Sequence, residues 1–464
     1  MSLFEPTMQA RARVSVLREL LETRGLSVCV VGAGKSGAAA ARLLHERGCR
    51  VRMLDDRAGA AWGAEEPGGP AGPIDKASVD AADLVVLSPG VPRRRPELRD
   101  AIELGKLVGE VEVASWFVSA PLVGVTGTNG KSTVTALVGH GFRSAGRSAF
   151  VGGNLGTPLS ELVRSGENVD VVVVELSSFQ LESLVEARFA AAVWLNLTPD
   201  HGDRYDSVTD YALAKRRIIE QRRIDGVGIL NAKDRYCTRF GLELGGPLRW
   251  FSGEGPSDLA GPMGTVVRAD GVAVRNEMDR IEHYDLAGVD GVHQRANRAA
   301  AIEVWRHFEL APASIRHALA EFRGLPHRME TIRSDDGCTW VNDSKATNVA
   351  AAVAALDADR APTVWIAGGR DKGSALEPLV EAARRNRIKA VLLIGEASDR
   401  FETALSGLVG VERTGTLERA VARARELAEP GDRILLAPAC ASYDQFIHFE
   451  ARGERFRALV EGRA

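Results

Sequence analysis

The chain has 464 residues, of which 45% are hydrophobic and 26% charged, and its formal net charge is −3. Because a single hydrophobic core stops growing at roughly 250 to 300 residues, we expect two or three domains and favour three. A charge so close to neutral gives no basic field of the kind that non-specific nucleic-acid binding requires, so we expect no nucleic-acid partner.

The cysteine spacing and the absence of long apolar segments indicate the cellular compartment of the protein. The five cysteines lie far apart and none forms a C-x-x-C pair, a pattern typical of buried thiols in a reducing compartment. No segment reaches the roughly 18 apolar residues of a membrane span, and the N-terminal residues lack an uninterrupted apolar signal-peptide core. We therefore expect a cytoplasmic protein without a membrane partner.

The first third of the chain predicts a parallel βαβ unit. SVCVVG, an Ala-rich stretch and RVRMLDD read as strand, helix and strand. The first turn carries Gly32, Gly34 and Gly37, and the acidic pair Asp55 and Asp56 follows about twenty residues later, as in dinucleotide-binding sites. This pattern predicts a diphosphate at the helix N-terminus, for which NAD is only one candidate. The alternative is a tight turn needed only for helix packing.

The strongest motif is GTNGKST, residues 127–133, which lies between an apolar strand and a predicted helix. Backbone N–H groups and a helix N-terminus in this arrangement bind phosphates. Lys131 is expected to contact the β- and γ-phosphates and Ser132 to bind Mg²⁺. Val125 stands where a standard Walker A motif has glycine, so the loop is the shorter G-x-x-G-K-[ST] form. A chance glycine-rich turn with a solvated lysine is the alternative.

Polar residues follow two further strands of the middle third. Glu175 ends a strand of four consecutive valines, which predicts burial on both faces, and the pair Asp200 and His201 ends the next. Ligands gather at the carboxyl ends of such strands, so we expect these side chains near the phosphate loop, as a magnesium site. Lys215 lies in the predicted helix DYALAKRRIIE, where the pattern alone indicates a solvated surface lysine.

The last third repeats the design of an apolar strand followed by a polar turn. NDSKATN and GGRDKG bring Asp343, Lys345, Thr347 and Lys372 to predicted strand ends, and ACASYDQF adds Ser442. Cations and hydroxyls together suit an anionic amino acid. Asp343 could instead bind a ribose, and turn-forming polar residues are the alternative for the whole set.

The strand and helix pattern predicts an α/β protein of three domains. We expect a Rossmann-like N-terminal domain at 1–120, a central P-loop-type mononucleotide-binding domain with a parallel sheet at 121–324, and a Rossmann-like C-terminal domain at 325–464.

The order of these motifs resembles that of the Mur ligases of bacterial peptidoglycan synthesis, over residues 27–456. The specific segments are ELSSFQLE in the middle domain and ACASYDQFIHFEARGERF near the C-terminus. The resemblance implies a cytoplasmic, monomeric enzyme that uses ATP and Mg²⁺ to join D-glutamate to UDP-N-acetylmuramoyl-L-alanine through an acyl phosphate. Such an enzyme serves cell-wall synthesis, and through it cell shape and division.

The resemblance also assigns expected roles to residues. The uridine diphosphate group would replace NAD at Gly32, Gly34, Ser36, Gly37, Asp55, Asp56, Ser88 and Gly90, and Asn154 would contact the muramoyl substrate or its metal. ATP would be bound by Gly127, Thr128, Asn129, Gly130, Lys131, Ser132, Thr133, Asn297, Arg328 and Asp343. The metal ligands would be Ser132, Glu175, His201 and Lys215. Glutamate would be held by Thr347, Lys372, Ser442 and Phe449, and the catalytic residues would be Lys131, His201, Lys215 and Lys345.

Two positions need separate mention. The lysine of this family that matches Lys215 is carbamylated by CO₂, so the resemblance overrides its interpretation as a surface lysine. Family members commonly show H-N-x-x-N, whereas this chain has His293, Gln294 and then Asn297. Asn297 matches the family residue that contacts the nucleotide. Gln294 stands where the family commonly has asparagine, so the departure affects only the contact made at that position.

Three alternative functions fit parts of the sequence. A ligase of the same fold could use another acceptor, such as L-glutamate or the polyglutamate chain of folates, although the folate enzymes lack ELSSFQLE. A catalytically inactive sensor of UDP-sugars would not need Lys131, Glu175, His201 and Lys215 together. A nicotinamide oxidoreductase would leave GTNGKST and GGRDKG unexplained.

Overall fold

The computed structural model describes residues 6–57, 62–63, 65–154, 156–202, 204–255, 263–277, 280–286, 289, 291–332, 334–371 and 373–463. The chain divides into two compact units. The first comprises Met1–Ala287 and Arg295–Glu321, and the second comprises Gly288–Gln294 and Phe322–Ala464. Each unit is described by itself.

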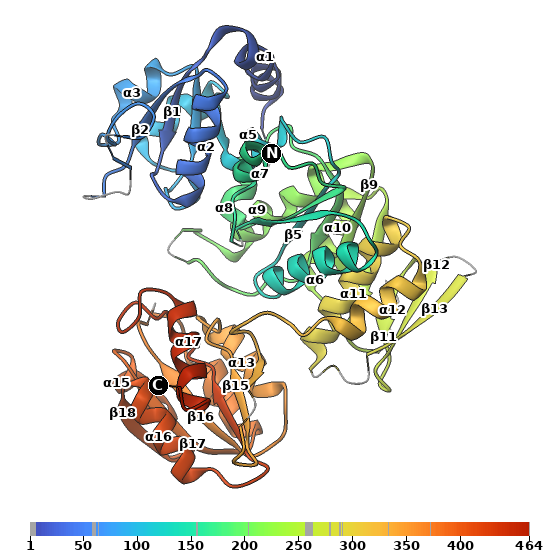
Figure 1. Ribbon diagram of the computed structural model, residues 1–464, viewed down its shortest axis with the longest axis vertical. Coiled ribbons are helices and arrows are strands. Elements are labelled where there is room, and N and C mark those ends of the chain that lie inside the picture. The colour runs from blue at the N-terminus through green and yellow to red at the C-terminus, as the bar shows by residue number, and fades with distance from the viewer. Residues whose placement is uncertain are drawn as a thin grey trace. The chain divides into compact units, whose positions relative to one another are not determined.

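The first unit begins with a four-stranded parallel sheet of order β2-β1-β3-β4 (Figure 1). Its strands coincide with the apolar runs of the first third of the sequence. They are β1 Ser27–Val31, β2 Arg50–Leu54, β3 Leu84–Leu87 and β4 Leu107–Gly109. The accompanying helices are α1 Met8–Arg24, α2 Lys35–Glu46, α3 Lys76–Ala81, the 3₁₀ helix η1 Pro96–Leu98, α4 Arg99–Glu103 and α5 Glu110–Ser115.

The rest of the first unit is built on a nine-stranded sheet of order β13-β12-β11-β10-β9-β8-β5-β7-β6. Its strands are β5 Leu122–Thr126, β6 Ala149–Gly153, β7 Val171–Glu175, β8 Phe189–Trp194, β9 Arg222–Asn231, β10 Leu248–Ser252, β11 Met263–Val267, β12 Val272–Glu277 and β13 Arg280–Asp285. The helices are α6 Lys131–Ser144, α7 Leu159–Ser165, α8 Ser178–Leu181, α9 Val208–Glu220, α10 Arg235–Leu244, α11 Val292–His307, which continues into this unit from the second, and α12 Pro312–Glu321.

The valine-rich strand β7 lies inside this sheet, between β5 and β6, and all five of its residues are buried. Strands with apolar residues on both faces are typical of parallel sheets covered by helices, so the prediction of a doubly buried strand is confirmed. β5 pairs with β7 and β8, and Val125 lies opposite Glu175. The phosphate loop and the acidic residue therefore leave the same edge of the sheet from neighbouring strands.

The second unit contains a six-stranded sheet of order β14-β15-β19-β16-β17-β18, parallel except for the edge strand β14. The strands are β14 Glu330–Ile332, β15 Thr339–Asn342, β16 Thr363–Gly368, β17 Ile388–Ile394, β18 Val411–Gly415 and β19 Arg433–Leu436. The helices are α13 Val349–Asp357, α14 Glu377–Arg385, α15 Ser398–Leu405, α16 Leu417–Leu427 and α17 Phe449–Val460.

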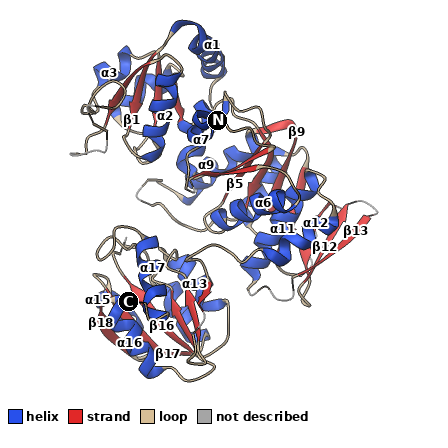
Figure 2. Ribbon diagram, in the orientation of Figure 1, coloured by secondary structure: helices blue, strands red, loops and turns tan. Residues whose placement is uncertain are grey.

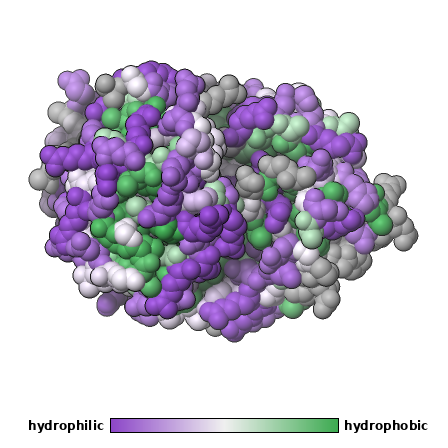
Figure 3. All heavy atoms as spheres, turned by 90° about the horizontal axis from the view of Figure 1, so that it is seen from below, coloured by the Kyte–Doolittle hydropathy of each residue, from purple (hydrophilic) through white to green (hydrophobic). Residues whose placement is uncertain are grey.

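Helices accompany the strands of all three sheets (Figure 2), which confirms the predicted α/β class. The described cysteines are free thiols, all buried except Cys338, which is half-buried. On the face drawn in Figure 3, hydrophilic residues cover much of the described surface with hydrophobic ones between them. Among the described helices, none combines the length and apolar character needed to cross a lipid bilayer.

Helix α9 shows how the local sequence positions a site residue. Ser207 caps its N-terminus by accepting a hydrogen bond from the Asp210 N–H at 3.1 Å. Tyr211 and Lys215, four residues apart, then lie on the same buried face of the helix. The interpretation of Lys215 as a surface lysine is wrong, because its residue is only 1% exposed.

Candidate active site

The phosphate loop connects β5 to α6 through Gly127–Gly130, in the strand–loop–helix order that the sequence predicts. Gly130 caps α6 with a left-handed backbone, φ 85°. A Cβ atom at Gly130 would lie 2.5 Å from Oδ1 of Asn297, so no larger residue fits without displacing that side chain. The structure therefore brings Asn297 of α11 against the loop, where the sequence expects a nucleotide contact.

Asn196 holds this loop in shape. Its Oδ1 atom accepts hydrogen bonds from the N–H groups of Thr128 at 3.1 Å and Asn129 at 2.9 Å, and its Nδ2 atom donates to the Asn129 carbonyl at 3.1 Å. The Thr198 N–H donates to the Thr128 hydroxyl at 3.1 Å. Sequence reasoning did not select Asn196. Since Asn196 accepts hydrogen bonds from the N–H groups of Thr128 and Asn129, the geometry of an anion-binding site is found at the start of α6.

Two lysine side chains meet beside the loop. Lys131 Nζ donates to the carbonyl oxygens of Gly127 and Thr128, both at 3.0 Å. Lys215 Nζ donates to the same Gly127 oxygen at 2.8 Å. Burial lowers the pKa of Lys215 well below its usual value, and the nearby charge of Lys131 lowers it further. The environment of Lys215 thus favours a neutral amine.

Aromatic rings surround the amine and His201. The Lys215 Nζ atom lies 4.8 Å from the ring centroid of Tyr211, and the imidazole of His201 lies 5.7 Å from the same ring. The imidazole also contacts Phe179 edge-on at 4.8 Å. His201 has a left-handed backbone, φ 55°, and its N–H donates to Asp200 Oδ1 at 2.8 Å. Such a conformation costs about 1–3 kcal/mol in a non-glycine residue, and it is found most often at functional sites.

Glu175 at the end of β7 and Ser132 in the first turn of α6 carry the oxygen atoms expected to bind a metal. Both side chains are buried, and Glu175 Oε1 accepts a hydrogen bond from Asn154 Nδ2 at 2.7 Å. Carboxylate and hydroxyl oxygens are the ligands that Mg²⁺ prefers, so this donor set fits a magnesium ion bound together with a phosphate. No cluster of three or more His, Cys, Asp or Glu side chains suited to a metal occurs in the described part of the chain.

A cavity of about 300 Å³ lies beside the two lysines and His201. Its lining comes from both sheets of the first unit and consists of Pro89, Gly90, Lys131, Asn154, Ser177, Ser178, Phe179, His201, Tyr211 and Lys215. The predicted residues Gly90, Lys131, Asn154, His201 and Lys215 therefore share one space. A loop of the N-terminal sheet closes this space beside the lysines.

The ELSSFQLE segment shapes another wall of the cavity. Ser177 caps α8 in a reciprocal capping box with Gln180, which fixes the short helix directly after β7. Phe179, half-buried in this helix, lines the cavity and packs against the imidazole of His201. The ELSSFQLE motif therefore also has a structural role, which its sequence alone did not predict.

The glycine-rich turn of the N-terminal sheet is tightly packed. A Cβ atom at Gly37 would lie 1.9 Å from the Gly32 carbonyl oxygen, and one at Gly32 would lie 2.7 Å from Ser88 Cβ. Gly34, with a Cβ position 3.6 Å from Ser88 Oγ, caps α2, and Ser36 lies half-buried in the first turn of that helix. The predicted turn and the Ser88 loop therefore adjoin each other.

Both acidic residues that follow β2 have protein partners. Asp55 Oδ2 accepts a hydrogen bond from the Ala33 N–H at 2.7 Å, and hydrogen bonds from the Arg57 guanidinium lower the pKa of Asp55 to about 2. Asp56 accepts from the Ile74 N–H at 2.8 Å and pairs with Arg95 at 2.7 Å. Asp55 is thus ionised at neutral pH and braces the glycine-rich turn.

The second unit brings its predicted residues to one edge of the sheet. Lys345 Nζ lies 5.2 Å from the ring centroid of Phe449, Thr347 is half-buried in the same loop, and Ser442 is buried after β19. Burial raises the pKa of Asp343 to about 6, although the positive charges of Arg328 and Lys345 act in the opposite direction. Lys372, predicted in the neighbouring loop, lies outside the described residues.

Arg452 of α17 ties these loops together. It is 1% exposed, its Nη2 atom donates to the carbonyl oxygens of Ser344 at 2.9 Å and Cys440 at 3.2 Å, and its Nε atom donates to Ser344 Oγ at 3.0 Å. A Cβ atom at Gly369 would lie 3.2 Å from Arg452 Nη1. One guanidinium therefore contacts the loops that follow β15, β16 and β19.

Family models match three successive parts of the chain. The Mur ligase MurD-like N-terminal domain matches residues 26–109, the Mur ligase middle domain 125–303 and the Mur ligase glutamate ligase domain 327–440. This chain belongs to the Mur ligase family. The resemblance stated from the motifs is thereby confirmed.

Curated relatives match this Mur ligase over nearly its whole length. It is 43% identical to the UDP-N-acetylmuramoylalanine–D-glutamate ligase of Myxococcus xanthus, over 95% of this chain and 99% of that protein. It is also 43% identical to the protein of that name from Anaeromyxobacter dehalogenans, over 96% and 99% of the two chains.

Solved structures of other family members share the fold. The MurF ligase of Thermotoga maritima in complex with ADP has a TM-score of 0.61 at 16% identity, over 100% of this chain and 99% of that one. The UDP-N-acetylmuramate-alanine ligase MurC of the same organism has a TM-score of 0.58 at 18% identity, over 95% and 100%. These likenesses concern the fold of this Mur ligase alone.

Sequence reasoning missed several residues that shape the site of this Mur ligase. Asn196 lies in NLTPDHGDRY, four residues before Asp200, and its place two residues after the end of β8 was the available signal. Tyr211 precedes Lys215 by one helical turn, a spacing that predicts contact. Arg452 gave no signal, because a buried arginine has the same sequence pattern as an exposed one.

Proposed function

We propose that this Mur ligase joins D-glutamate to UDP-N-acetylmuramoyl-L-alanine and converts ATP to ADP and phosphate. Relatives of that name with 40–43% identity over at least 95% of the chain support the choice of substrates. The observation that carries the chemistry is the single cavity in which Gly90 of the N-terminal sheet faces Lys131 and Lys215. A carboxylate held by the first domain can meet a nucleotide phosphate there.

In this proposal each domain mainly binds one substrate. Residues 1–120 bind the uridine diphosphate group at the glycine-rich turn and the Ser88 loop, residues 121–324 bind ATP, and residues 325–464 bind glutamate. The N-terminus of α2 supports the first assignment, because Gly34 caps it without a side-chain hydrogen bond and the turn packs against Ser88.

The reaction begins with attack of the L-alanine carboxylate on the γ-phosphorus of ATP. The bond between the γ-phosphorus and the β,γ-bridging oxygen breaks, ADP leaves, and an acyl phosphate forms. Lys131 turns from the Gly127 carbonyl to the phosphate oxygens and disperses the negative charge that develops on them, together with N–H groups at the start of α6. The neutral glutamate amine then attacks the acyl carbon, the C–O bond to phosphate breaks, and the nitrogen loses one proton as phosphate leaves.

Ser132, Glu175 and His201 are the residues that would hold Mg²⁺. When bound, the ion screens the negative charges of the phosphate and the carboxylate, so that they can approach each other. Asn154, by its hydrogen bond to Glu175 Oε1, orients that carboxylate for the task.

Lys215 is proposed to carry a carbamate. Its neutral amine adds to CO₂, a C–N bond forms and one proton is released from the nitrogen, so the neutral amine becomes an anionic carbamate. The burial of Lys215 beside Lys131 supports this chemistry, because a buried amine next to another cation is readily deprotonated. The carbamate would then serve the metal with His201.

The loops of the second unit are proposed to hold glutamate. Lys345 is proposed to act on the reacting groups, and Thr347, Lys372, Ser442 and Phe449 are proposed to bind the amino acid. Arg328 and Asp343 are proposed to face the nucleotide. The cation–π contact of Lys345 with Phe449 supports a shared site for these residues, because the contact holds the ammonium beside the ring.

The enzyme is proposed to act as a cytoplasmic monomer in the synthesis of peptidoglycan precursors, and thus in cell shape and division. The second candidate is the same reaction with L-glutamate as the acceptor. The names of the related enzymes favour D-glutamate.

One assay separates these alternatives. Purified protein is incubated with UDP-N-acetylmuramoyl-L-alanine, ATP and Mg²⁺, and phosphate release is measured with D-glutamate or with L-glutamate. We expect release with D-glutamate only. Release with L-glutamate alone would reverse the assignment of the acceptor, and no release with either would contradict the ligase function.

Lys215→Ala should lose activity that short-chain carboxylic acids partly restore.

A further inference from the structure

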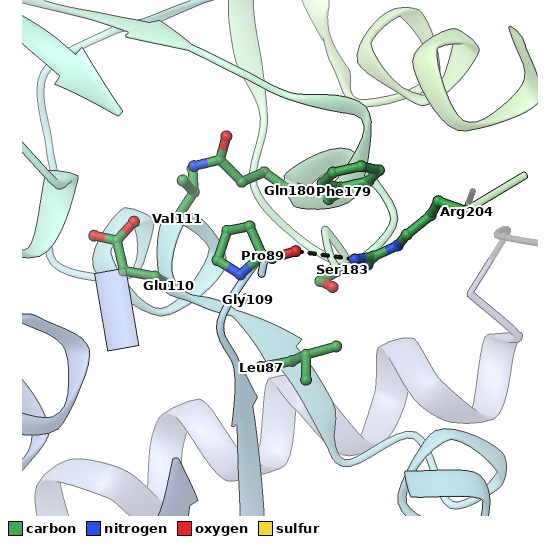
Figure 4. Close-up of a pocket in the computed structure, with 9 residues that line it drawn as sticks. All are labelled: Leu87, Pro89, Gly109, Glu110, Val111, Phe179, Gln180, Ser183 and Arg204. Atoms are coloured by element: carbon green, nitrogen blue, oxygen red, sulfur yellow. Dashed lines mark hydrogen bonds between the residues drawn. The ribbon is translucent and has the colours of Figure 1, made fainter. Parts of the chain in front are cut away.

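One arginine of the central domain donates two hydrogen bonds to a loop of the N-terminal domain. Arg204 Nη1 donates to the carbonyl oxygen of Pro89 at 3.1 Å, and Nη2 donates to that of Val91 at 3.2 Å. Figure 4 shows the first of these bonds beside Phe179. The partners are 113 to 115 residues apart in sequence. Only a planar guanidinium offers two donors at this fixed spacing.

The guanidinium is itself held in place from the central domain. Arg204 Cζ lies 4.0 Å from the ring centroid of Phe179, and Nη2 lies 3.9 Å from Glu182 Oε2. Tyr205, the next residue, donates its hydroxyl to Glu182 Oε1 at 2.5 Å. The Arg204 side chain is 12% exposed. These contacts therefore fix the orientation of the guanidinium.

The loop that accepts the hydrogen bonds of Arg204 forms a wall of the cavity. Pro89 and Gly90 line the space that also contains Lys131 and Lys215. On its other side the loop packs on the glycine-rich turn, since a Cβ atom at Gly32 would lie 2.8 Å from Val91 Cγ2. The loop thus lies between the proposed diphosphate site and the proposed phosphate-transfer site.

A small pocket shows how closely the loop is packed against the central domain. Its volume is about 10 Å³, room for about one water molecule, and Pro89, Phe179 and Arg204 are among the residues around it. The space between the two domains at this point therefore admits no substrate, and the contact is structural.

We propose that Arg204 is a positioning residue for the carboxylate-bearing substrate. By fixing the carbonyl oxygens of Pro89 and Val91, it sets the position of the loop relative to Lys131, and so the distance between the substrate carboxylate and the γ-phosphate. This inference rests on the proposed function, because it assigns the loop to the UDP-linked substrate.

The test compares Arg204→Lys and Arg204→Gln with a matched control. The control is Asp206→Asn, which removes the ion pair of Asp206 with Arg94 at 2.6 Å between the same two segments, where both side chains are largely exposed. Three readouts are needed: the KM of each substrate, the affinity for UDP-N-acetylmuramoyl-L-alanine by calorimetry, and the melting temperature.

We expect both Arg204 variants to weaken binding of the UDP-linked substrate roughly tenfold, which corresponds to about 1.4 kcal/mol, and to raise its KM similarly. The KM values of ATP and glutamate and the melting temperature should stay close to those of the wild type, as should all values of the control. Unchanged affinity in active Arg204 variants, or an equal loss for all three substrates with a lower melting temperature, would overturn the inference. A wild type that binds the UDP-linked substrate but releases no phosphate would overturn the proposed function instead.

Discussion

Lys131 and Lys215 donate to one shared acceptor, the carbonyl oxygen of Gly127, with Nζ to oxygen distances of 3.0 and 2.8 Å. Two ammonium groups at a single oxygen repel each other, and Lys215 is buried as well, so its charged form is the less stable one. The arrangement relaxes when Lys131 turns to a phosphate and Lys215 becomes neutral or a carbamate. Both changes belong to the proposed reaction.

Lys215→Met should stabilise the protein and abolish turnover. Because the pKa of Lys215 is lowered on folding, the unfolded chain binds more protons above the folded pKa, and wild-type stability should rise with pH toward about 10. The variant should lack this rise and gain about 1–3 kcal/mol at pH 7. Urea unfolding in CO₂-depleted buffer at several pH values measures both effects. The exposed Lys233→Met is the control, and a less stable Lys215→Met would contradict the prediction.

Gly130→Ala should destroy ATP binding by displacing Asn297. The added Cβ atom would lie 2.5 Å from Asn297 Oδ1, at a left-handed backbone of φ 85°. Gly146→Ala is the matched control, since Gly146 has φ 77° but no atom within 4 Å of a Cβ position. Both variants should lose about 1–2 kcal/mol of stability to backbone strain. Only Gly130→Ala should lose affinity for a fluorescent ATP analogue, and equal affinities in the two variants would argue against the loop assignment.

Asp343→Asn should change the pH dependence of stability. The pKa of Asp343 is raised to about 6 in the folded protein, so wild-type stability should fall as the pH rises from about 4 through 6. The amide variant should lack this fall and be more stable above pH 6. Thermal unfolding from pH 4 to pH 8 measures the difference, with the exposed Asp359→Asn as control. Parallel pH profiles for Asp343→Asn and the wild type would refute the expectation.

Arg452→Lys should weaken glutamate binding selectively. Lysine cannot replace the planar donors that contact Ser344 and Cys440 together, so the loops that carry Lys345 and Ser442 lose their common support. We expect the KM of glutamate to rise about tenfold, a loss of about 1.4 kcal/mol, while the KM of the UDP-linked substrate stays constant.

The control for Arg452→Lys lies on the same helix. Arg455 is exposed and pairs with Glu418 at 2.8 Å, and Arg455→Ala should leave the kinetics unchanged, since exposed ion pairs contribute about 0–1 kcal/mol. An increase of the KM for every substrate in Arg452→Lys would mean general loosening of the second unit instead.

Local patterns in the sequence sufficed to predict the strands that carry the site. Buried parallel strands appear as runs such as VVVV, and each ends in a polar or glycine-rich turn, so the positions of Gly127 and Glu175 at the sheet edge followed from the order of residues. The three-domain α/β fold followed from the repetition of this pattern.

Contacts between distant segments could not be predicted in this way. Whether Lys215 faces water or the core depends on which face of α9 packs on the sheet, and the helix sequence contains cationic residues on several sides. Asn196 and Arg204 act through backbone groups of other loops, which carry no sequence signal of their own. The burial of Lys215 contradicts the surface position that the pattern alone indicated, and the role that the family resemblance implies for Lys215 stays a prediction.

The most direct test of phosphate transfer to the carboxylate follows the oxygen atoms. UDP-N-acetylmuramoyl-L-alanine with ¹⁸O in both carboxylate oxygens is incubated with the wild-type protein, ATP, Mg²⁺ and D-glutamate, and the released phosphate is analysed by mass spectrometry. The carboxylate oxygen that attacks phosphorus leaves with the phosphate when the amine attacks the acyl carbon, so we predict one ¹⁸O atom in each phosphate. Released phosphate without ¹⁸O would contradict the acyl-phosphate mechanism.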